Sequence, residues 1–543
     1  MKNKFIYLAV LAAGFASCEP EFENEVGANY SAGDADFSSY VAIGNSLTAG
    51  YMDGTVSRGG QANSYPNLLA QQFALVGGGE FTQPSYAEDV NNLGGILGIP
   101  GFNTRLVIDA TEGRPENIAG TSTITLTPQA TAYNNMGVPG AKSFHLLANT
   151  YGNVANLPNA NPYFIRHATS TSATILGDAM SKNPTFFSNW IGANDVLSYA
   201  TNGGAQSDGV TPAADHNSPV NLDPSSYGVN DITNSNVFAS VYSTLINTLI
   251  SGGAKGVVAT VPSVTSIPYF TTVPYAPLTA QGIGKGLVPA GSDVAAQITA
   301  GTAAMNQLNT ALYNNLAAVF TGYGEPNRVK PLNPATANPL LIYDVDAADR
   351  SMQISGALQG QGMPAAQADV IGATFGKARQ TTSADLVVLP ASSAIGTPNA
   401  TAVTNPVLVG AGAVNNGVSY PMENKWVLTA NEQAKVATAT AAYNSSIRSI
   451  AAANNLAVAD MNAILNQLVG GLRIEDGTIY TANYFSSATA SSVLFSLDGV
   501  HPNAKGYAVI TNEIIKVINR HYNANLPFVY ASSFPGATIL PTN

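Results

Sequence analysis

The chain has 543 residues, of which 45% are hydrophobic and only 10% are charged, and its formal net charge at pH 7 is −11. This length is long for one domain and short for four, and the apolar content is sufficient for a large buried core. We expect no nucleic-acid partner, because phosphate groups are bound by clustered Lys and Arg and no basic run occurs beyond the first few residues.

The N-terminal segment 1–18 has the layout of a secretory signal. Lys2 and Lys4 precede a short apolar run, and the segment ends at Cys18, the only cysteine of the chain, which excludes an intrachain disulfide and a zinc site built from cysteines. The segment resembles the signal and lipobox of bacterial envelope lipoproteins of Bacteroidetes type. That resemblance implies a lipid anchor on Cys18 and a place in the cell envelope, at the outer membrane. An ordinary signal with an incidental cysteine is the alternative, and the acidic residues 19–36 are expected to form a flexible linker.

Residues 37–262 and 426–543 are predicted to form one α/β core, because short apolar runs alternate there with helical patterns. The predicted strands lie at about 37–44, 184–191, 255–261 and 456–461. The predicted helices lie at about 64–73, 142–148, 237–250, 431–453 and 503–520. The remaining predictions are an irregular excursion over 77–130, short strands within it at 103–109 and 122–127, and a turn over 133–141.

Residues 263–425 do not continue this alternation of strands and helices and are predicted to form a large insertion. They contain one long Ala-rich helical pattern, about 293–320, and two strand-like runs, 340–345 and 384–390, separated by loops rich in Pro, Gly and Asn. We expect this block to act as a lid or a substrate-shaping subdomain that forms an apolar acyl pocket over the strand ends.

Strands that alternate with helices predict a parallel sheet in a three-layer α/β/α core. In such a sheet, functional groups gather at the carboxyl ends of the strands. Two polar residues fall there on this assignment, because Ser46 follows the predicted strand 37–44 and Asn194 follows the predicted strand 184–191.

Ser46 is the candidate nucleophile, and a free hydroxyl becomes one only when a base takes its proton. His501 is the best base, because it lies three residues after Asp498 and one short turn can supply both the imidazole and the carboxylate that orients it. Attack on a carbonyl creates an oxyanion, for which the Gly137 N–H, the Asn194 amide and the Ser46 N–H are candidate donors. Each residue alone is equally typical of a turn or a helix cap, so the hypothesis depends on their occurring together.

Four short blocks resemble those of the SGNH (GDSL-type) hydrolase family, in the family's order. They are Gly44-Asn45-Ser46-Leu47, Asn135-x-Gly137-x-x-Gly140, Gly192-x-Asn194-Asp195 and Asp498-x-x-His501. The resemblance, which covers roughly half of the chain, implies a flavodoxin-like α/β/α fold and a hydrolase that needs no metal or organic cofactor. It assigns Ser46 as nucleophile, His501 as base and Asp498 as its orienter, with Gly137 and Asn194 as oxyanion donors. Asn45 departs from the family's Asp, which we expect to alter local hydrogen bonding rather than abolish the chemistry.

We therefore expect a serine ester hydrolase, an esterase or lipase-like enzyme that cleaves small or lipid-like acyl esters through an acyl-serine intermediate. A carbohydrate O-deacetylase of the same family and a non-catalytic surface binding lipoprotein on this fold remain as alternatives. The chain contains neither the Gly-x-Ser-x-Gly elbow of α/β-hydrolases nor a His-Glu-x-x-His zinc motif. The oligomeric state is left open. The other histidines, expected to be structural or solvated, are His145, His167, His216 and His521.

Overall fold

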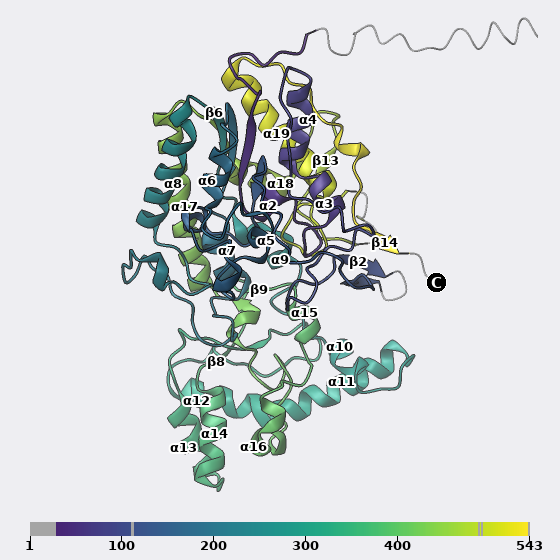
Figure 1. The fold of residues 1–543 in the computed structure, drawn as a ribbon. Coiled ribbons are helices and arrows are strands. Elements are labelled where there is room, and N and C mark those ends of the chain that lie inside the picture. The colour runs from purple at the N-terminus through teal and green to yellow at the C-terminus, as the bar shows by residue number, and fades with distance from the viewer. Residues whose placement is uncertain (1–28, 110–112, 487–488, 490–491, 541–543) are drawn as a thin grey trace, which may run out of the picture.

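The computed structural model describes residues 29–109, 113–486, 489 and 492–540. It contains an α/β core and, below it in the view of Figure 1, a lobe formed by the insertion. The predicted signal 1–18, its Cys18 and residues 19–28 of the predicted linker lie outside the described residues. Within the described part of the chain, no helix is both long and apolar enough to cross a bilayer.

The core is built on a sheet of five parallel strands. In chain order they are β1 (Tyr40–Gly44), β4 (Asn135–Gly137), β5 (Phe186–Trp190), β6 (Lys255–Ala259) and β11 (Ala457–Ala459). Their order across the sheet is β11-β6-β5-β1-β4, which is the 2-1-3-4-5 order of flavodoxin-like sheets. The order reverses between β1 and β5, and a crevice forms at the carboxyl ends of the strands at such a point.

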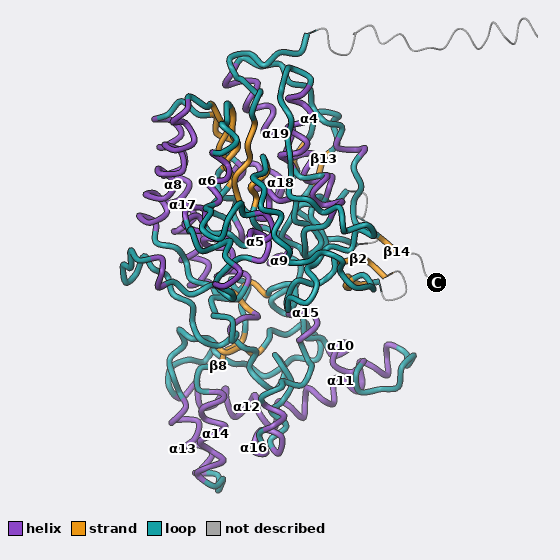
Figure 2. Tube along the Cα trace, viewed as in Figure 1, coloured by secondary structure: helices purple, strands orange, loops and turns teal. Residues whose placement is uncertain are grey.

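Helices cover both faces of the sheet, as Figures 1 and 2 show. Alternate residues of a strand point to opposite faces, and Val41 and Ile43 pack into one hydrophobic cluster while Tyr40 and Ala42 pack into another. The Val41 face is covered by α6 (Ile175–Met180), α8 (Ser235–Leu249) and α17 (Ala430–Ala453). The Tyr40 face is covered by α4 (Tyr65–Ala74) and α19 (Ala504–Tyr522). The predicted α/β class with a parallel sheet is thus confirmed.

Short elements complete the core around the strand ends. The helices are α2 (Ser46–Ala49), α3 (Arg58–Ala62), α5 (Pro162–His167), α7 (Asn194–Thr201), α9 (Pro268–Thr271) and α18 (Met461–Gly470). The strands of two small sheets are β2 (Leu106–Asp109), β3 (Arg114–Asn117) and β14 (Ile539–Leu540), and β12 (Leu472–Arg473) with β13 (Ile479–Tyr480).

Several local predictions are wrong. The predicted turn 133–141 contains β4, a core strand of three residues that is too short to leave an apolar run in the sequence. No strand forms over 122–127, because the partner of β2 is β3 instead. The predicted helix 142–148 is a 3₁₀ helix, Ser143–Leu147. The described end of the predicted linker is packed rather than free, since the Asp34 N–H donates to the carbonyl of Tyr522 and Ala35 is buried.

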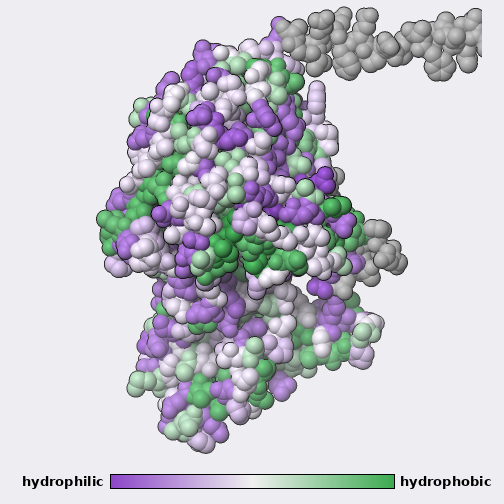
Figure 3. Space-filling view, viewed as in Figure 1, coloured by the Kyte–Doolittle hydropathy of each residue, from purple (hydrophilic) through white to green (hydrophobic). Residues whose placement is uncertain are grey.

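The insertion has a hydrophobic core of its own, which includes Met305, Phe320 and Phe375. This core begins at Ala280 rather than at 263, because Val264 and Phe270 still pack into the main core. Figure 3 shows the insertion as a lobe joined to the core through a narrower section. Its helices are α10 (Ala280–Lys285), α11 (Val294–Leu308), α12 (Asn314–Gly322), α13 (Ser351–Gly360), α14 (Ala365–Phe375), α15 (Ala391–Ala394) and α16 (Pro406–Gly410). Its strands β7 (Leu341–Tyr343) and β8 (Ala378–Gln380) pair with each other. Its strand β9 (Leu386–Val387) pairs with β10 (Val427–Leu428), which follows the insertion.

Candidate active site

Ser46 lies at the carboxyl end of β1, on the edge of the sheet where the strand order reverses. β1 ends at Gly44, and a Cβ there would collide with the Thr48 side chain and the carbonyl oxygen of Trp190, so this tight strand-to-helix turn requires glycine. Asn45 caps the short helix α2, because its Oδ1 accepts from the Leu47 N–H at 3.1 Å. This departure from the family pattern therefore keeps a capping oxygen beside Ser46.

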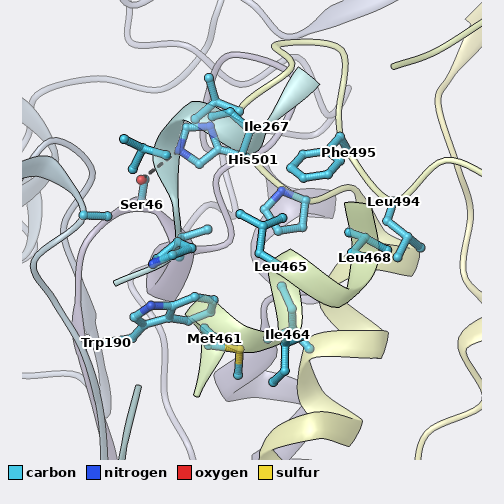
Figure 4. Close-up of a pocket in the computed structure, with 18 of the residues that line it drawn as sticks. Ser46, Trp190, Ile267, Met461, Ile464, Leu465, Leu468, Leu494, Phe495 and His501 are labelled. Carbon is cyan, nitrogen blue, oxygen red and sulfur yellow. Dashed lines mark hydrogen bonds between the residues drawn. The ribbon is translucent and has the colours of Figure 1, made fainter. Parts of the chain in front are cut away.

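His501 and Asp498 meet Ser46 in a continuous chain of hydrogen bonds. The Nε2 of His501 lies 2.8 Å from the Oγ of Ser46, a residue 455 positions away in the sequence, and Figure 4 shows this contact. The Nδ1 of His501 lies 2.9 Å from the Oδ2 of Asp498. When the imidazole carries its hydrogen on Nδ1 and donates it to the Asp498 carboxylate, the lone pair of Nε2 faces the serine hydroxyl. In this arrangement the imidazole can accept the serine proton.

The carboxylate of Asp498 is held by donors on both oxygens. Its Oδ1 accepts from the backbone N–H groups of His501 and Val500 and from the Ser496 hydroxyl, all at 2.9 Å. Burial would raise the pKa of Asp498, but the charge of His501 and the hydrogen bonds from His501 and Val500 outweigh it and lower the pKa. Asp498 thus stays ionised and can orient the imidazole and stabilise an imidazolium.

A turn at Asp53-Gly54 holds the loop that carries Asp498, and sequence reasoning missed it. The Gly54 N–H donates to Asp498 Oδ2 at 3.1 Å, and the Asp53 N–H donates to the Ser496 hydroxyl at 3.0 Å. The Asp53 carboxylate accepts from the Leu497 N–H at 3.0 Å, and burial raises its pKa to about 6. The only sequence signal was an Asp-Gly turn close after Ser46, which by itself indicates no partner.

Asn194 is placed to donate to an oxyanion. It is the first residue of α7, it follows β5, and it borders the same pocket as Ser46. One hydrogen of its Nδ2 group goes to the Ala141 carbonyl at 2.9 Å, which fixes the amide. Because an amide nitrogen carries two hydrogens, the second remains for a ligand.

Gly137 does not fit the donor role that the sequence suggested. Its N–H donates to the Oδ1 of Asn135 at 3.0 Å, and a Cβ at this position would collide with the backbone of Thr48 and Ala49. Its glycine is therefore required by close packing of β4 against α2. Gly140 of the same motif fits better, because it is exposed, has a φ of +80° and adjoins Ala141, which holds Asn194. Among the described residues, the Gly140 N–H makes no hydrogen bond to a backbone carbonyl.

An apolar pocket opens beside Ser46 and His501 (Figure 4). Its volume is about 860 Å³ including the space open to solvent. Its polar side chains besides the Trp190 indole are Asn45, Ser46, Asn194 and His501. Of the predicted insertion 263–425, which is described throughout, Val264 and Ile267 line it and no later residue does, so the expectation that this block forms the pocket holds only for its first residues.

The other histidines are engaged elsewhere. The Nε2 of His216 lies 2.8 Å from an oxygen of Asp231, so it does have a carboxylate partner, at a spacing of fifteen residues that sequence reasoning did not consider. His145 accepts from the Lys142 N–H, and burial lowers its pKa to about 3. His167 is buried, and His521 contacts a backbone carbonyl. Among the described residues, no group of three or more His, Cys, Asp or Glu side chains is arranged to hold a metal ion.

Comparisons of this chain with models of protein families, with curated proteins and with solved structures find no significant match.

Proposed function

We propose that the protein is a serine ester hydrolase of the SGNH type, with Ser46 as its nucleophile. The observation that carries the proposal is the hydrogen-bond chain from Ser46 through His501 to Asp498, with distances of 2.8 and 2.9 Å. A serine, an imidazole and a carboxylate in this order are the parts that acyl transfer requires. The strand order and the position of Ser46 and Asn194 at the β1–β5 crevice support the same assignment.

In the proposed first step, the Oγ of Ser46 attacks the ester carbonyl while His501 Nε2 takes its proton. The developing oxyanion accepts from the Asn194 amide and the backbone N–H groups of Ser46 and Gly140. The imidazolium, stabilised by Asp498, then protonates the alcohol oxygen as its bond to the acyl carbon breaks. In the second step, His501 deprotonates a water that attacks the acyl-serine, and the carboxylic acid leaves as the Ser46 hydroxyl is restored.

The pocket favours a lipid-like acyl ester over a carbohydrate O-acetyl ester. A sugar brings several hydroxyl groups that lose free energy when they are buried without partners, and apart from the reaction centre the lining is almost wholly apolar. The aligned side chains of Ser46, His501 and Asp498 also favour an enzyme over a binding module, since a binding protein has no need of an imidazole aligned between a serine and a carboxylate. We further propose an envelope location through a lipid anchor at Cys18, for which the N-terminal sequence is the support.

Hydrolysis of p-nitrophenyl acetate and butyrate by the purified protein tests the proposal. We expect turnover by the wild type and almost none by Ser46→Ala, with both proteins unfolding at the same temperature. Equal turnover by the two proteins would contradict a role for Ser46, because the reaction has no route without the nucleophile.

A further inference from the structure

The pocket beside Ser46 has a polar end and an apolar body. Ser46, Asn45, Asn194 and His501 form the polar end. The rest is formed by α18, by the loop before the catalytic histidine, by the first turns of α19 and by residues 262–267. These lining residues include Met461, Ile464, Leu465, Leu468, Leu494, Phe495, Val509, Ile510 and Ile267.

α18 forms one continuous wall of this pocket. Met461, Ile464, Leu465 and Leu468 are spaced three, one and three residues apart, so they lie on one face of the helix. Figure 4 shows Leu468 and Leu494 on the side of the pocket away from Ser46, with Leu465 between Ser46 and these two residues. The wall thus leads from the reacting serine into the apolar body of the pocket.

We propose that this pocket binds the hydrocarbon chain of a fatty acyl ester, with the ester carbonyl at Ser46 and the chain end near Leu468 and Leu494. The proposal rests on the proposed function, because it identifies the pocket's occupant from its contact with the nucleophile. A fatty acyl ester with a linear chain fits this pocket, because its polar group is at one end and the polar side chains of the pocket are also at one end.

The length of the wall formed by α18 gives a minimum length for the bound hydrocarbon chain. At 1.5 Å per residue, Met461 to Leu468 covers about 10 Å. Carbon–carbon bonds of about 1.5 Å advance a zigzag chain by somewhat less than their own length, so roughly eight carbons cover that distance. Each buried methylene is worth about a fourfold gain in binding. The value of kcat/KM is therefore expected to rise steeply from butyrate to octanoate and decanoate esters.

The test fills the far end of the pocket by Leu468→Trp. The matched control is Val469→Trp, because the next residue of the same helix is 55% exposed and does not line the pocket. The measurement is the ratio of kcat/KM for p-nitrophenyl decanoate to that for the butyrate ester. We expect the ratio to fall at least tenfold in Leu468→Trp and to stay within twofold of the wild type in Val469→Trp. An unchanged ratio in Leu468→Trp would overturn the proposal.

Calorimetric titration of decanoate into Ser46→Ala separates this proposal from the proposed function, because binding needs no catalysis. We expect decanoate to bind to Ser46→Ala and butyrate to bind to it at least tenfold more weakly. Adding Leu468→Trp to Ser46→Ala should weaken the binding of decanoate. Ester turnover that depends on Ser46 together with no decanoate binding would refute the acyl site and leave the hydrolase standing. Decanoate binding without turnover of any ester would refute the hydrolase and leave the acyl site standing.

Discussion

Replacing Asp498 by Asn tests how the imidazole is prepared for catalysis. The Oδ1 of Asp498 accepts from three donors, the backbone N–H groups of Val500 and His501 and the Ser496 hydroxyl. An Asn at this position is therefore expected to keep its oxygen on that side and to turn its NH2 group toward the Nδ1 of His501. The imidazole must then accept at Nδ1 and carry its hydrogen on Nε2, facing Ser46, where it can no longer take the serine proton.

The expected loss in kcat is about 10⁴-fold, the size found where an Asn fixes the wrong tautomer in a catalytic triad. At about 1.4 kcal/mol for each factor of ten, that loss corresponds to roughly 5.5 kcal/mol of transition-state stabilisation. The fold should survive, because Asn is nearly the same size as Asp and keeps the contacts on the Oδ1 side.

The assay is steady-state hydrolysis of p-nitrophenyl butyrate, with circular dichroism melts of both proteins as the folding control. KM is expected to change little, because Asp498 does not line the pocket. A folded Asp498→Asn variant with kcat within tenfold of the wild type would refute the reasoning that Asp498 selects the tautomer.

Three further changes test neighbouring parts of the account. Asn194→Ala should lower kcat on the order of 100-fold or more with little change in KM, as for the loss of one oxyanion donor, and unchanged kcat would remove Asn194 from that role. Gly137→Ala should lower the melting temperature more than Gly140→Ala. A methyl group at 137 would collide with the backbone of α2, whereas the space around 140 is open and only its positive φ of +80° opposes a side chain. The reverse order of melting temperatures would contradict the packing of β4 against α2. Asp53→Asn tests a buried carboxyl whose pKa is about 6 in the folded protein, above the 3.8 of an ordinary Asp. Because the folded state binds the carboxyl proton of Asp53 more tightly than the unfolded state, the stability that this group contributes falls as the pH rises from 3.8 through about 6. Between pH 4 and pH 7, the free energy of unfolding of the variant should therefore rise by on the order of 2–3 kcal/mol relative to that of the wild type. Urea unfolding at the two pH values measures this, and a difference that stays constant with pH would contradict it.

The residues proposed as catalytic could be singled out in the sequence because each lies in a short local pattern. Ser46 follows an apolar run that stops at glycine, and Asp498 and His501 share one turn. They could therefore be proposed as nucleophile, orienting carboxylate and base without knowledge of the fold. The strands β1, β5, β6 and β11 were visible for the same reason, since each is a short apolar run buried on both faces.

What the sequence did not show depends on contacts between distant segments. β4 has three residues and no apolar run, and its place is determined by its pairing with β1. The engagement of Gly137 was not visible either, because its N–H donates to the Oδ1 of Asn135 and its missing side chain lets β4 pack against α2. Asp53 is 443 and 444 residues from the two positions that it contacts, so no local pattern could reveal it.

The pocket was predicted in the insertion 263–425, which supplies only Val264 and Ile267 to it. An insertion as large as 263–425 suggested a lid, but the wall is α18, which directly follows β11 and was hidden by the extension of the predicted strand to Met461. The block 263–425 contacts the loop of Asp498 and His501 through Tyr269, whose N–H donates to the Gly499 carbonyl at 2.9 Å. The Leu389 N–H donates in turn to the Tyr269 carbonyl.

The central claim is that Ser46 is an activated nucleophile, and a fluorophosphonate probe tests it most directly because the probe forms a covalent bond only with such a serine. The measurement is the intact mass of the folded protein after exposure, followed by peptide mapping, with Ser46→Ala and heat-unfolded protein as controls. The account predicts one adduct per chain, on Ser46, and none in either control. No adduct on the folded protein, or an adduct on another serine, would contradict it.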